Sequence, residues 1–400
     1  MGEFAKTHYN NAITRDNLLS MLYPRLFLAR ELLTDDGVIF CSIDDRNQAH
    51  VKLLFDDIFG EENFVADFIR KTKSTTNDAK TGVNYQHEFL LCFARNKEQV
   101  SLLGGEKDLS NYKNPDNDPN GAWVIADPSA KSGNAATGWF LVKNPYTGKE
   151  DYPPEGMFWR FSKNTIQKHI EEGRICFKKD HKPNERGFIF KRYLKDLQTT
   201  QSMFDSLAFV DNAYMNQVAT KELKELGLVE SFSYPKGVEF IKKILLHSTD
   251  SDSIVLDFFA GSGTTGHAVL ALNREDGGNR KFILCQLNEK TETTPNGIAY
   301  DVTAKRLKRI MTGECYDGTK PEKWLEENEP YGGSLEVYDI GSVANFETTA
   351  GKTPFEVIDE TLYGKEKFST VKEKIEWVCS NFEKTQKYLE ESDLNKGCGD

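Results

Sequence analysis

The sequence of 400 residues predicts an α/β fold that is interrupted by an inserted module. Two stretches, residues 16–58 and 234–311, alternate apolar helices with short apolar strands, which is the pattern of helices that cover a largely parallel sheet. The sequence between them is polar, rich in turn-forming residues and weakly periodic. Because 400 residues exceed the usual size of one hydrophobic core, we expect two or three domains.

The first stretch is predicted to form a helix, a strand and a second helix. Apolar residues recur at helical spacing over residues 16–33, where Pro24 either kinks the helix or marks its start. Residues 37–43 are a short apolar run of the kind buried in a parallel sheet. The polar residues 44–47 then open a second helix that reaches Ile58.

The α/β pattern stops near residue 70 and returns near residue 234. In the intervening part, proline, glycine and asparagine are concentrated in residues 104–156, and short strands are expected at 89–93 and 187–190. The sequence therefore predicts one α/β domain that is split around a separate, loop-rich module. In its second half, strands are expected at residues 254–258 and 282–287, and helices at 238–245, 265–272 and 298–311.

Three glycines separate the strand that ends near Asp257 from the next helix. Gly261, Gly263 and Gly266 permit positive φ angles and let a ligand approach the main chain closely. The free N–H groups and the dipole at the helix start favour a polar or anionic ligand. The turn therefore predicts a nucleotide-like ligand.

Residues 261–266 match the G-x-G-x-x-G fingerprint of dinucleotide-binding enzymes, so a nicotinamide-dependent oxidoreductase is one alternative. Such an enzyme usually places the first glycine directly after the strand, whereas Phe258, Phe259 and Ala260 intervene here. A P-loop is excluded because no Gly-Lys-Ser/Thr closes the turn.

The sequences around the glycines resemble a known cofactor motif. Residues 257–265 read Asp-Phe-Phe-Ala-Gly-Ser-Gly-Thr-Thr and resemble the S-adenosylmethionine-binding motif of the amino-methylating DNA methyltransferases. Residues 232–236, Phe-Ser-Tyr-Pro-Lys, resemble the companion motif, and this order is that of the permuted beta class. Further segments resemble the modification subunit of type III restriction–modification systems; these are residues 22–26, 32–40, 42–45, 58–64, 144–148, 152–156, 158–161 and 191–194.

The resemblance covers residues 16–310 and implies a Rossmann-like methyltransferase sheet. It implies that the inserted module is a target-recognition, DNA-binding domain, and that a small α+β extension follows the methyltransferase domain. The expected boundaries are 1–69 and 233–318 for the two parts of the methyltransferase domain, 70–232 for the recognition domain and 319–400 for the acidic extension.

The resemblance also implies a set of cofactor-binding residues. Gly261 and Gly263 should border the methionine portion of S-adenosylmethionine, and Gln286 or Glu289 should bind its ribose. Alternatives stay open for three of these residues. Asp257 orients the turn, meets the cofactor or caps the helix, and the threonines either bond the cofactor carboxylate or cap the helix. The complete set is Lys236, Asp257, Phe258, Ala260, Gly261, Gly263, Thr264, Thr265, Gln286 and Glu289.

The catalytic motif of the resembled family, Asp/Asn-Pro-Pro-Tyr, is not found in the sequence. In that family it accepts hydrogen bonds from the target amine and stacks on a base flipped from the duplex. Its expected place lies before Met1, so we expect a chain truncated before its catalytic residues, or half of a split enzyme. Asn144-Pro145-Tyr146 lacks the second proline and is interpreted as a turn.

DNA binding is predicted from the charge distribution, although the net charge is −11. Residues 156–200 carry eleven basic and five acidic side chains, while residues 321–400 carry eighteen acidic and nine basic ones. Local basicity determines the attraction for phosphates. The candidate DNA-binding residues are Arg160, Lys163, Lys178, Lys179, Lys191 and Arg192.

The remaining features point to a cytoplasmic protein. Seven dispersed cysteines without a C-x-x-C pair indicate a reducing compartment and no metal site. No apolar run of membrane-spanning length occurs. The prediction is an adenine-N6 DNA methyltransferase that uses S-adenosylmethionine, acts on double-stranded DNA, forms a homodimer and binds a restriction/translocase subunit. The alternative is a non-catalytic DNA- or cofactor-binding module.

Overall fold

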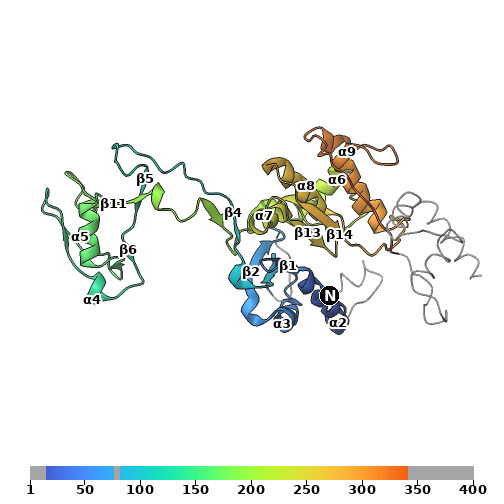
Figure 1. Cartoon of the computed structure of the whole chain (residues 1–400), viewed down its shortest axis with the longest axis horizontal. Coiled ribbons are helices and arrows are strands. Elements are labelled where there is room, and N and C mark those ends of the chain that lie inside the picture. The colour runs from blue at the N-terminus through green and yellow to red at the C-terminus, as the bar shows by residue number, and fades with distance from the viewer. Residues whose placement is uncertain (1–14, 76–81, 341–400) are drawn as a thin grey trace, which may run out of the picture. The chain divides into compact units, whose positions relative to one another are not determined.

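The computed structural model describes residues 15–75 and 82–340 (Figure 1). The expected helix that carries Val371 and Phe382, and most of the C-terminal extension, lie outside these residues. The main unit ends at Ser334, and a second unit begins at Leu335. Among the described residues, no helix is both long and apolar enough to cross a lipid bilayer.

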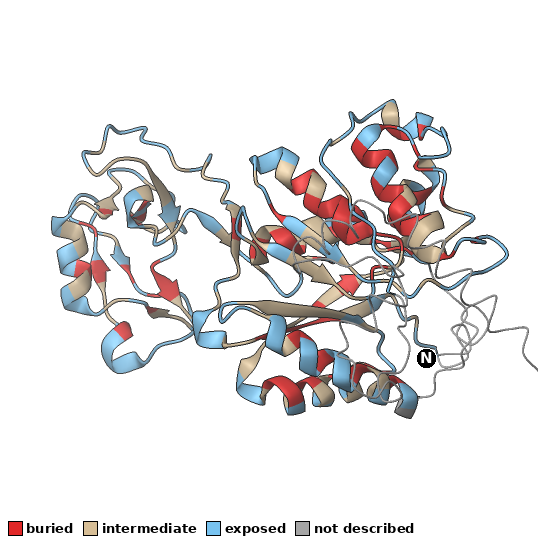
Figure 2. Ribbon diagram, turned by 45° about the vertical axis from the view of Figure 1, so that its right-hand side comes forward, coloured by how far each residue is buried: buried red, intermediate tan, exposed pale blue. Residues whose placement is uncertain are grey.

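The first part of the α/β domain contains α2 (Arg15–Leu32), β1 (Val38–Ile43), α3 (Gln48–Phe59), β2 (Phe64–Lys71) and β3 (His87–Ala94). The strands form an antiparallel sheet in the order β1-β3-β2. The parallel environment expected for residues 37–43 is therefore wrong. The buried sides of α2 and α3 face this sheet (Figure 2).

Pro24 lies inside α2, so it does not mark the start of the helix, which was one of the two alternatives left open by the sequence. The helix continues from Arg15 through Pro24 to Leu32. Pro24 lies on the exposed side, while Leu22 and Leu26 are buried in the core. Packing of this apolar face outweighs the backbone hydrogen bond that proline removes.

The expected boundary after residue 69 falls inside β2. β2 pairs with β3 as far as Lys71 opposite His87, so both strands belong to the first sheet. The chain also returns to this sheet before the second α/β part begins, because the Lys71 amide donates to Phe209 O at 3.0 Å. Phe209 is fully buried against Phe68 and Phe240. The inserted part that has its own core therefore spans fewer residues than the expected range 70–232.

We call residues 107–200 the inserted module; the Lys107 amide donates to Thr200 O at 2.8 Å where its two ends meet. Its main sheet is antiparallel, in the order β10-β11-β5, and α5 packs against β10. A separate apolar core is formed by Val142, Trp159, Ile166, Ile175, Phe188 and Phe190. The bounds are β5 (Trp123–Ala126), β6 (Ser129–Ala130), α4 (Ala135–Gly138), β7 (Val142–Lys143), β8 (Glu150–Asp151), β9 (Phe158–Trp159), α5 (Lys163–Glu171), β10 (Ile175–Phe177) and β11 (Phe188–Tyr193).

Two connecting strands and one helix join the module to the α/β domain. β4 (Leu103–Glu106) and β12 (Gln201–Met203) pair antiparallel on either side of the module. α6 (Asn216–Glu225) follows and carries buried Leu223.

The second part of the α/β domain is a parallel β–α–β unit. β13 (Ile254–Asp257) and β14 (Lys281–Leu284) are parallel neighbours, and α8 (Thr264–Asp276) connects them. Figure 1 shows α7 (Val238–Ser248) and α8 beside these strands. This unit confirms the predicted α/β class. A π-helical segment (Ala299–Ala304), α9 (Lys305–Thr312) and the short α10 (Glu322–Leu325) follow.

Candidate functional site

The glycine turn lies between β13 and α8, as predicted. Gly261 and Gly263 have φ angles of +52° and +74°, which favour glycine. A Cβ atom at Gly263 would lie 3.1 Å from Thr303 Cγ2. Gly266 has a different function, since a Cβ there would lie 2.8 Å from Leu307 Cδ2. The first two glycines therefore shape the turn, and the third lets α8 pack closely on its neighbours.

Asp257 holds the turn together from the end of β13. Its Oδ1 accepts the Phe259 amide at 3.0 Å, and its Oδ2 accepts the Thr265 hydroxyl at 2.6 Å. Of the roles left open by the sequence, this geometry matches orientation of the turn.

The hydroxyls of Thr264 and Thr265 are both used inside the protein. Thr264 is 5% exposed, and its Oγ1 donates to Lys236 O at 3.0 Å. Thr265 is 7% exposed and bonds Asp257. These hydroxyls stabilise the turn in this structure, so the groups at the helix start that a ligand can use are main-chain N–H groups.

Gln286 reaches the glycine turn directly from the segment after β14. Its Oε1 accepts the Gly261 amide at 2.7 Å, and its Nε2 donates to Leu287 O at 2.9 Å. Glu289 is exposed, and its main-chain O accepts the Ile298 amide. Of the two candidate ribose-binding residues, Gln286 contacts the turn.

Phe258 and Ala260 occupy structural positions beside the turn. Phe258 packs against the core of the first sheet. Ala260 is buried, and its amide donates to Cys285 O at 3.1 Å. These contacts connect the turn to both parts of the α/β domain.

Lys236 lies in a group of charges next to the turn. Its ammonium pairs with Glu88 on β3, and Glu88 also accepts Arg70 Nη1 at 2.8 Å. Burial lowers the pKa of Lys236, although Glu88 opposes this shift. Burial alone would raise the pKa of Glu88, but the two cations lower it. Because two cations share one carboxylate, the group retains positive charge and suits an anionic ligand.

Three residues at the turn were missed by the sequence analysis. Thr303 Oγ1 donates to Gly261 O at 2.7 Å, and the guanidinium of Arg306 contacts Ser262 and Thr264. His267 Nδ1 lies 3.3 Å from Arg306 Nε. In the sequence, Arg306 is one cation in an amphipathic helix with Lys305 and Lys308, a pattern typical of solvated side chains.

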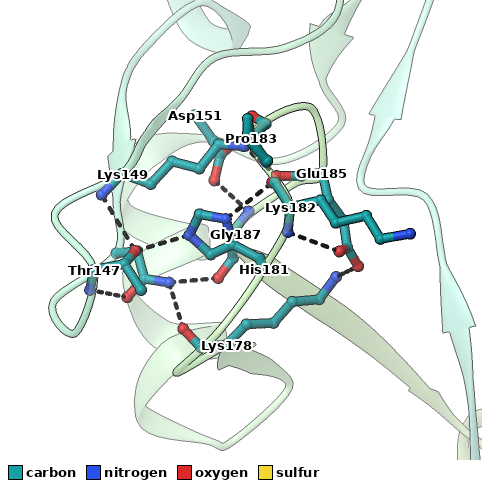
Figure 3. Close-up of polar contacts among 10 residues, drawn as sticks. Thr147, Lys149, Asp151, Lys178, His181, Lys182, Pro183, Glu185 and Gly187 are labelled. Atoms are coloured by element: carbon teal, nitrogen blue, oxygen red, sulfur yellow. Dashed lines mark hydrogen bonds and ion pairs between the residues drawn. The ribbon is translucent and has the colours of Figure 1, made fainter.

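Asn144 is confirmed as a structural turn residue of the inserted module. It is fully buried, and its Nδ2 donates to Lys178 O at 2.8 Å and Gly187 O at 2.7 Å. Its Oδ1 accepts the amides of Tyr146 and Thr147. Figure 3 shows the two loops that these contacts join, with the Thr147 hydroxyl beside His181.

Lys191 is not a surface cation, contrary to the sequence interpretation. It is 3% exposed, and its ammonium lies 2.5 Å from Asp116 and 2.6 Å from Asp118. Strand alternation places Lys191 on the face of β11 opposite to the core residues Phe188 and Phe190, where Asp116 and Asp118 cover it. Hydrogen bonds from Lys191 and Tyr193 outweigh desolvation and lower the pKa of Asp118.

The other predicted DNA-binding cations differ in their environment. Lys178 pairs with Glu185 (Figure 3). Lys179 lies 5.8 Å above the exposed Tyr146 ring. Of the six predicted DNA-binding cations, those that are exposed and have no ion pair within the described residues are Arg160, Lys163, Lys179 and Arg192. Arg192 also borders a cavity of about 370 Å³ together with Lys107, Asp108, Leu109, Tyr112, Leu197 and Ser202.

Comparison with known proteins places the chain in a family. The N6/N4 DNA methylase family model matches residues 3–295. The chain is 36% identical over 281 residues to the type III restriction-modification enzyme StyLTI Mod subunit of Salmonella typhimurium, covering 69% of this chain and 41% of that protein. It is 33% identical to the EcoPI Mod subunit of Escherichia phage P1, with coverages of 73% and 50%.

A type II relative is covered more completely. The chain is 30% identical to methyltransferase M.KpnI of Klebsiella pneumoniae, and 73% of each protein is covered. By contrast, the chain spans about half the length of the type III relatives that it matches. The glycine spacing had left a nicotinamide-dependent oxidoreductase open as an alternative, and the family match favours a DNA methylase instead. The chain belongs to the N6/N4 DNA methylase family.

Proposed function

We propose that this chain binds S-adenosylmethionine and DNA as part of an adenine-N6 DNA methyltransferase of a type III restriction–modification system. The observation that carries the proposal is the glycine turn between β13 and α8, in a chain of the DNA methylase family. S-adenosylmethionine supplies an activated methyl group. An exocyclic amine of a flipped base is its proposed acceptor.

The cofactor roles follow from the contacts around the turn. We place the methionine portion beside Gly261 and its carboxylate near Lys236, where Arg70 and Lys236 share Glu88. Lys236 adjoins the turn because its carbonyl accepts the Thr264 hydroxyl. Gln286 is the proposed ribose contact, and it must release the Gly261 amide when it turns to a ligand hydroxyl.

Titration calorimetry with S-adenosylmethionine and, separately, with NAD⁺ tests the cofactor assignment. We expect saturable binding of S-adenosylmethionine and none of NAD⁺. Binding of NAD⁺ alone would contradict the proposal. Cys285 offers a second readout, because its thiol is exposed and its carbonyl accepts the Ala260 amide. Bound cofactor should slow alkylation of Cys285, measured by peptide mass spectrometry.

Transfer of labelled methyl groups to duplex DNA tests the catalytic part. The 400 residues contain no Asp/Asn-Pro-Pro-aromatic motif, so we expect this chain alone to transfer little or no methyl. Cofactor and DNA binding without transfer favours the alternative of a binding module or half of a split enzyme. Rapid methyl transfer by this chain alone would mean that residues other than an Asp/Asn-Pro-Pro-aromatic motif catalyse the reaction.

We propose that DNA phosphates contact the exposed cations of the inserted module, chiefly Arg160 and Lys163. These lie next to each other around the start of α5, and neither has an ion pair within the described residues. Lys178 and Lys191 contribute less, because Glu185 neutralises the first and the second is buried. Each phosphate contact adds about 0.9 to the salt dependence of binding.

The double variant Arg160→Gln/Lys163→Gln tests this surface. We expect weaker binding to duplex DNA and a salt slope that is shallower by about 2, measured by fluorescence anisotropy. The matched control Lys143→Gln/Lys168→Gln removes the same charge, but Lys143 pairs with Glu150 and Lys168 pairs with Glu172. Equal slopes for both double variants would mean that only net charge matters and that this surface is not the contact.

We also propose that the chain forms a homodimer through a second apolar row on α2. Leu19, Tyr23 and Phe27 are spaced by four residues, and Tyr23 and Phe27 are 47% and 50% exposed. Beside them lies a cavity of about 390 Å³, lined by Leu19, Ser20, Tyr23 and Leu54. Projecting rings next to a cavity on one face can be self-complementary, as a two-fold interface requires.

Sedimentation equilibrium tests the dimer. Tyr23→Glu/Phe27→Glu should give monomers, whereas Leu207→Glu, at another exposed apolar residue, should not. A monomeric wild-type chain would contradict the proposal. Because the type III relatives are named as Mod subunits, we further propose a restriction/translocase subunit as a partner. Co-purification with the product of the adjacent reading frame tests that partner.

A further inference from the structure

We propose that Arg306 and Thr303 are positioning residues that fix the glycine turn, and that they thereby set the affinity for the methionine portion of the cofactor. The inference rests on the proposed cofactor site. Neither side chain is needed to contact the cofactor; each acts through the main chain and hydroxyls of the turn.

Arg306 fixes the turn with one end of its guanidinium. It is 1% exposed, and its Nη1 lies 2.9 Å from Thr264 Oγ1, 3.1 Å from Ser262 Oγ and 3.4 Å from Ser262 O. Ser262 and Thr264 flank Gly263. The contacts therefore span the part of the turn in which the chain takes a positive φ.

The other two nitrogens of the guanidinium, Nε and Nη2, face α8 and α6. His267 Nδ1 accepts from Nε at 3.3 Å and lies 3.2 Å from Nη2. Glu222 is the ion-pair partner, at 3.9 Å, but its two oxygens also accept the Val238 amide. Arg306 is thus oriented by α6 and α8 together and has only a distant counter-charge.

The position of the Arg306 charge lowers the stability of the folded protein when no ligand is bound. A cation near a helix N-terminus opposes the helix dipole, and burial adds a desolvation cost. Burial lowers the pKa of Arg306 to about 10. The contacts that offset these costs are those with Ser262, Thr264 and His267, so the buried Arg306 and the turn depend on each other.

Thr303 fixes the other end of the turn. Its hydroxyl donates to Gly261 O at 2.7 Å, and its Cγ2 would lie 3.1 Å from a Cβ at Gly263. Thr303 lies in the π-helical segment, three residues before Arg306. Such π-helical segments are frequent at functional sites.

Arg306→Lys is the main test, with Arg309→Lys as its matched control. Arg309 lies on the same helix and is 5% exposed, but it bonds Leu226 O and Thr319 Oγ1, not the glycine turn. Both variants should lose stability to urea. We expect Arg306→Lys alone to weaken S-adenosylmethionine binding by about tenfold or more, and Arg309→Lys to stay within about twofold of wild type.

A ligand without the methionine portion separates positioning from general damage. Binding of 5′-methylthioadenosine should change little in Arg306→Lys, because that ligand does not need the methionine end of the turn. Equal losses for both ligands, or equal effects of the two arginine variants, would overturn the inference. Failure of the wild-type chain to bind S-adenosylmethionine would instead overturn the proposed function.

Thr303 provides an independent test should Arg306→Lys not fold. Thr303→Val removes the bond to Gly261 O but keeps the side-chain shape. We expect about three- to tenfold weaker binding of S-adenosylmethionine, and recovery in Thr303→Ser, which restores the hydroxyl. Equal affinities of the valine and serine variants would contradict the role of Thr303.

Discussion

Thr264, Thr265 and Asn144 each have a polar side chain that is satisfied inside the protein. Their residue types suit either a ligand or a turn, and the sequence could not decide between the two. The contacts show that Thr264 and Asn144 hold main-chain carbonyls in place and that Thr265 holds the Asp257 carboxylate. At this site, side chains shape the turn and leave main-chain N–H groups for a ligand.

Gly263→Ala should destabilise the protein by about 1–3 kcal/mol and weaken cofactor binding. The new Cβ meets Thr303 at 3.1 Å while φ is +74°. Gly277→Ala is the control, because its φ is +71° but the added Cβ meets nothing within 4 Å. Urea unfolding of both variants measures the effect. An equal loss in both would mean that φ strain alone, and not the contact with Thr303, accounts for it.

His267 should make the protein less stable as pH falls below 6.5. Burial and the Arg306 charge lower its pKa well below the usual 6.5, so the folded state stays neutral where the unfolded chain binds a proton. Below pH 6.5 the unfolded state is therefore favoured by up to about 1.4 kcal/mol per pH unit, until the folded pKa is reached. Above pH 6.5 this contribution to stability is complete.

His267→Asn is the test, because asparagine can still accept from Arg306 but does not titrate. Urea unfolding between pH 7.5 and 5.5 should show a smaller pH dependence for the variant by about 1 kcal/mol or more. Contributions of His169 and His247, whose pKa values are also lowered by burial, cancel in the difference. Parallel curves for wild type and variant would contradict the assignment.

The helices and strands around the cofactor turn were predictable element by element. Apolar spacing located α7, α8 and β13 because each buries one face against its neighbours. The errors came from tertiary packing. Pro24 lies inside α2, whose apolar face is buried in the core. β1 pairs antiparallel with β3, and because β3 lies about fifty residues further along the chain, no local pattern shows the direction of this pairing.

The inserted module depends on a buried amide between two loops. Asn144→Asp should destabilise it by about 2–4 kcal/mol, because a carboxylate cannot donate to Lys178 O and Gly187 O. Asn134→Asp is the control, since Asn134 Oδ1 only accepts from Thr137 at the start of α4. Thermal unfolding followed by the fluorescence of the module's tryptophans measures both variants, and similar losses would refute this account.

At the scale of the whole molecule, the described residues contain more than one apolar core. The core of the inserted module is formed only by residues between 126 and 190. It is separate from the cores that surround α2 and α7. The sequence predicted the insertion but placed its first boundary too early. Pairing between β2 and β3 is non-local, so no local pattern marks where the first sheet ends.

Separate cores should unfold separately. Phe188→Ala removes a ring that packs on Trp159 and should destabilise the module by about 3–5 kcal/mol. Hydrogen exchange read by mass spectrometry should then show loss of protection in residues 123–193 and unchanged protection in β13 and α8. Equal loss of protection throughout would show that the cores unfold as one unit.

The sequence by itself determined the α/β class, the glycine turn, the insertion and the family, because these depend on local spacing and on contiguous motifs. Only the tertiary structure decided how the turn is held. Arg306, Thr303 and Gln286 reach the turn from segments that lie 25 to 44 residues along the chain from their partners. Only the tertiary structure likewise showed that Lys191 is buried, because the two carboxylates that bind it lie more than 70 residues away in the sequence. Such contacts arise from packing between distant segments, and their energies do not appear in any local pattern of residues.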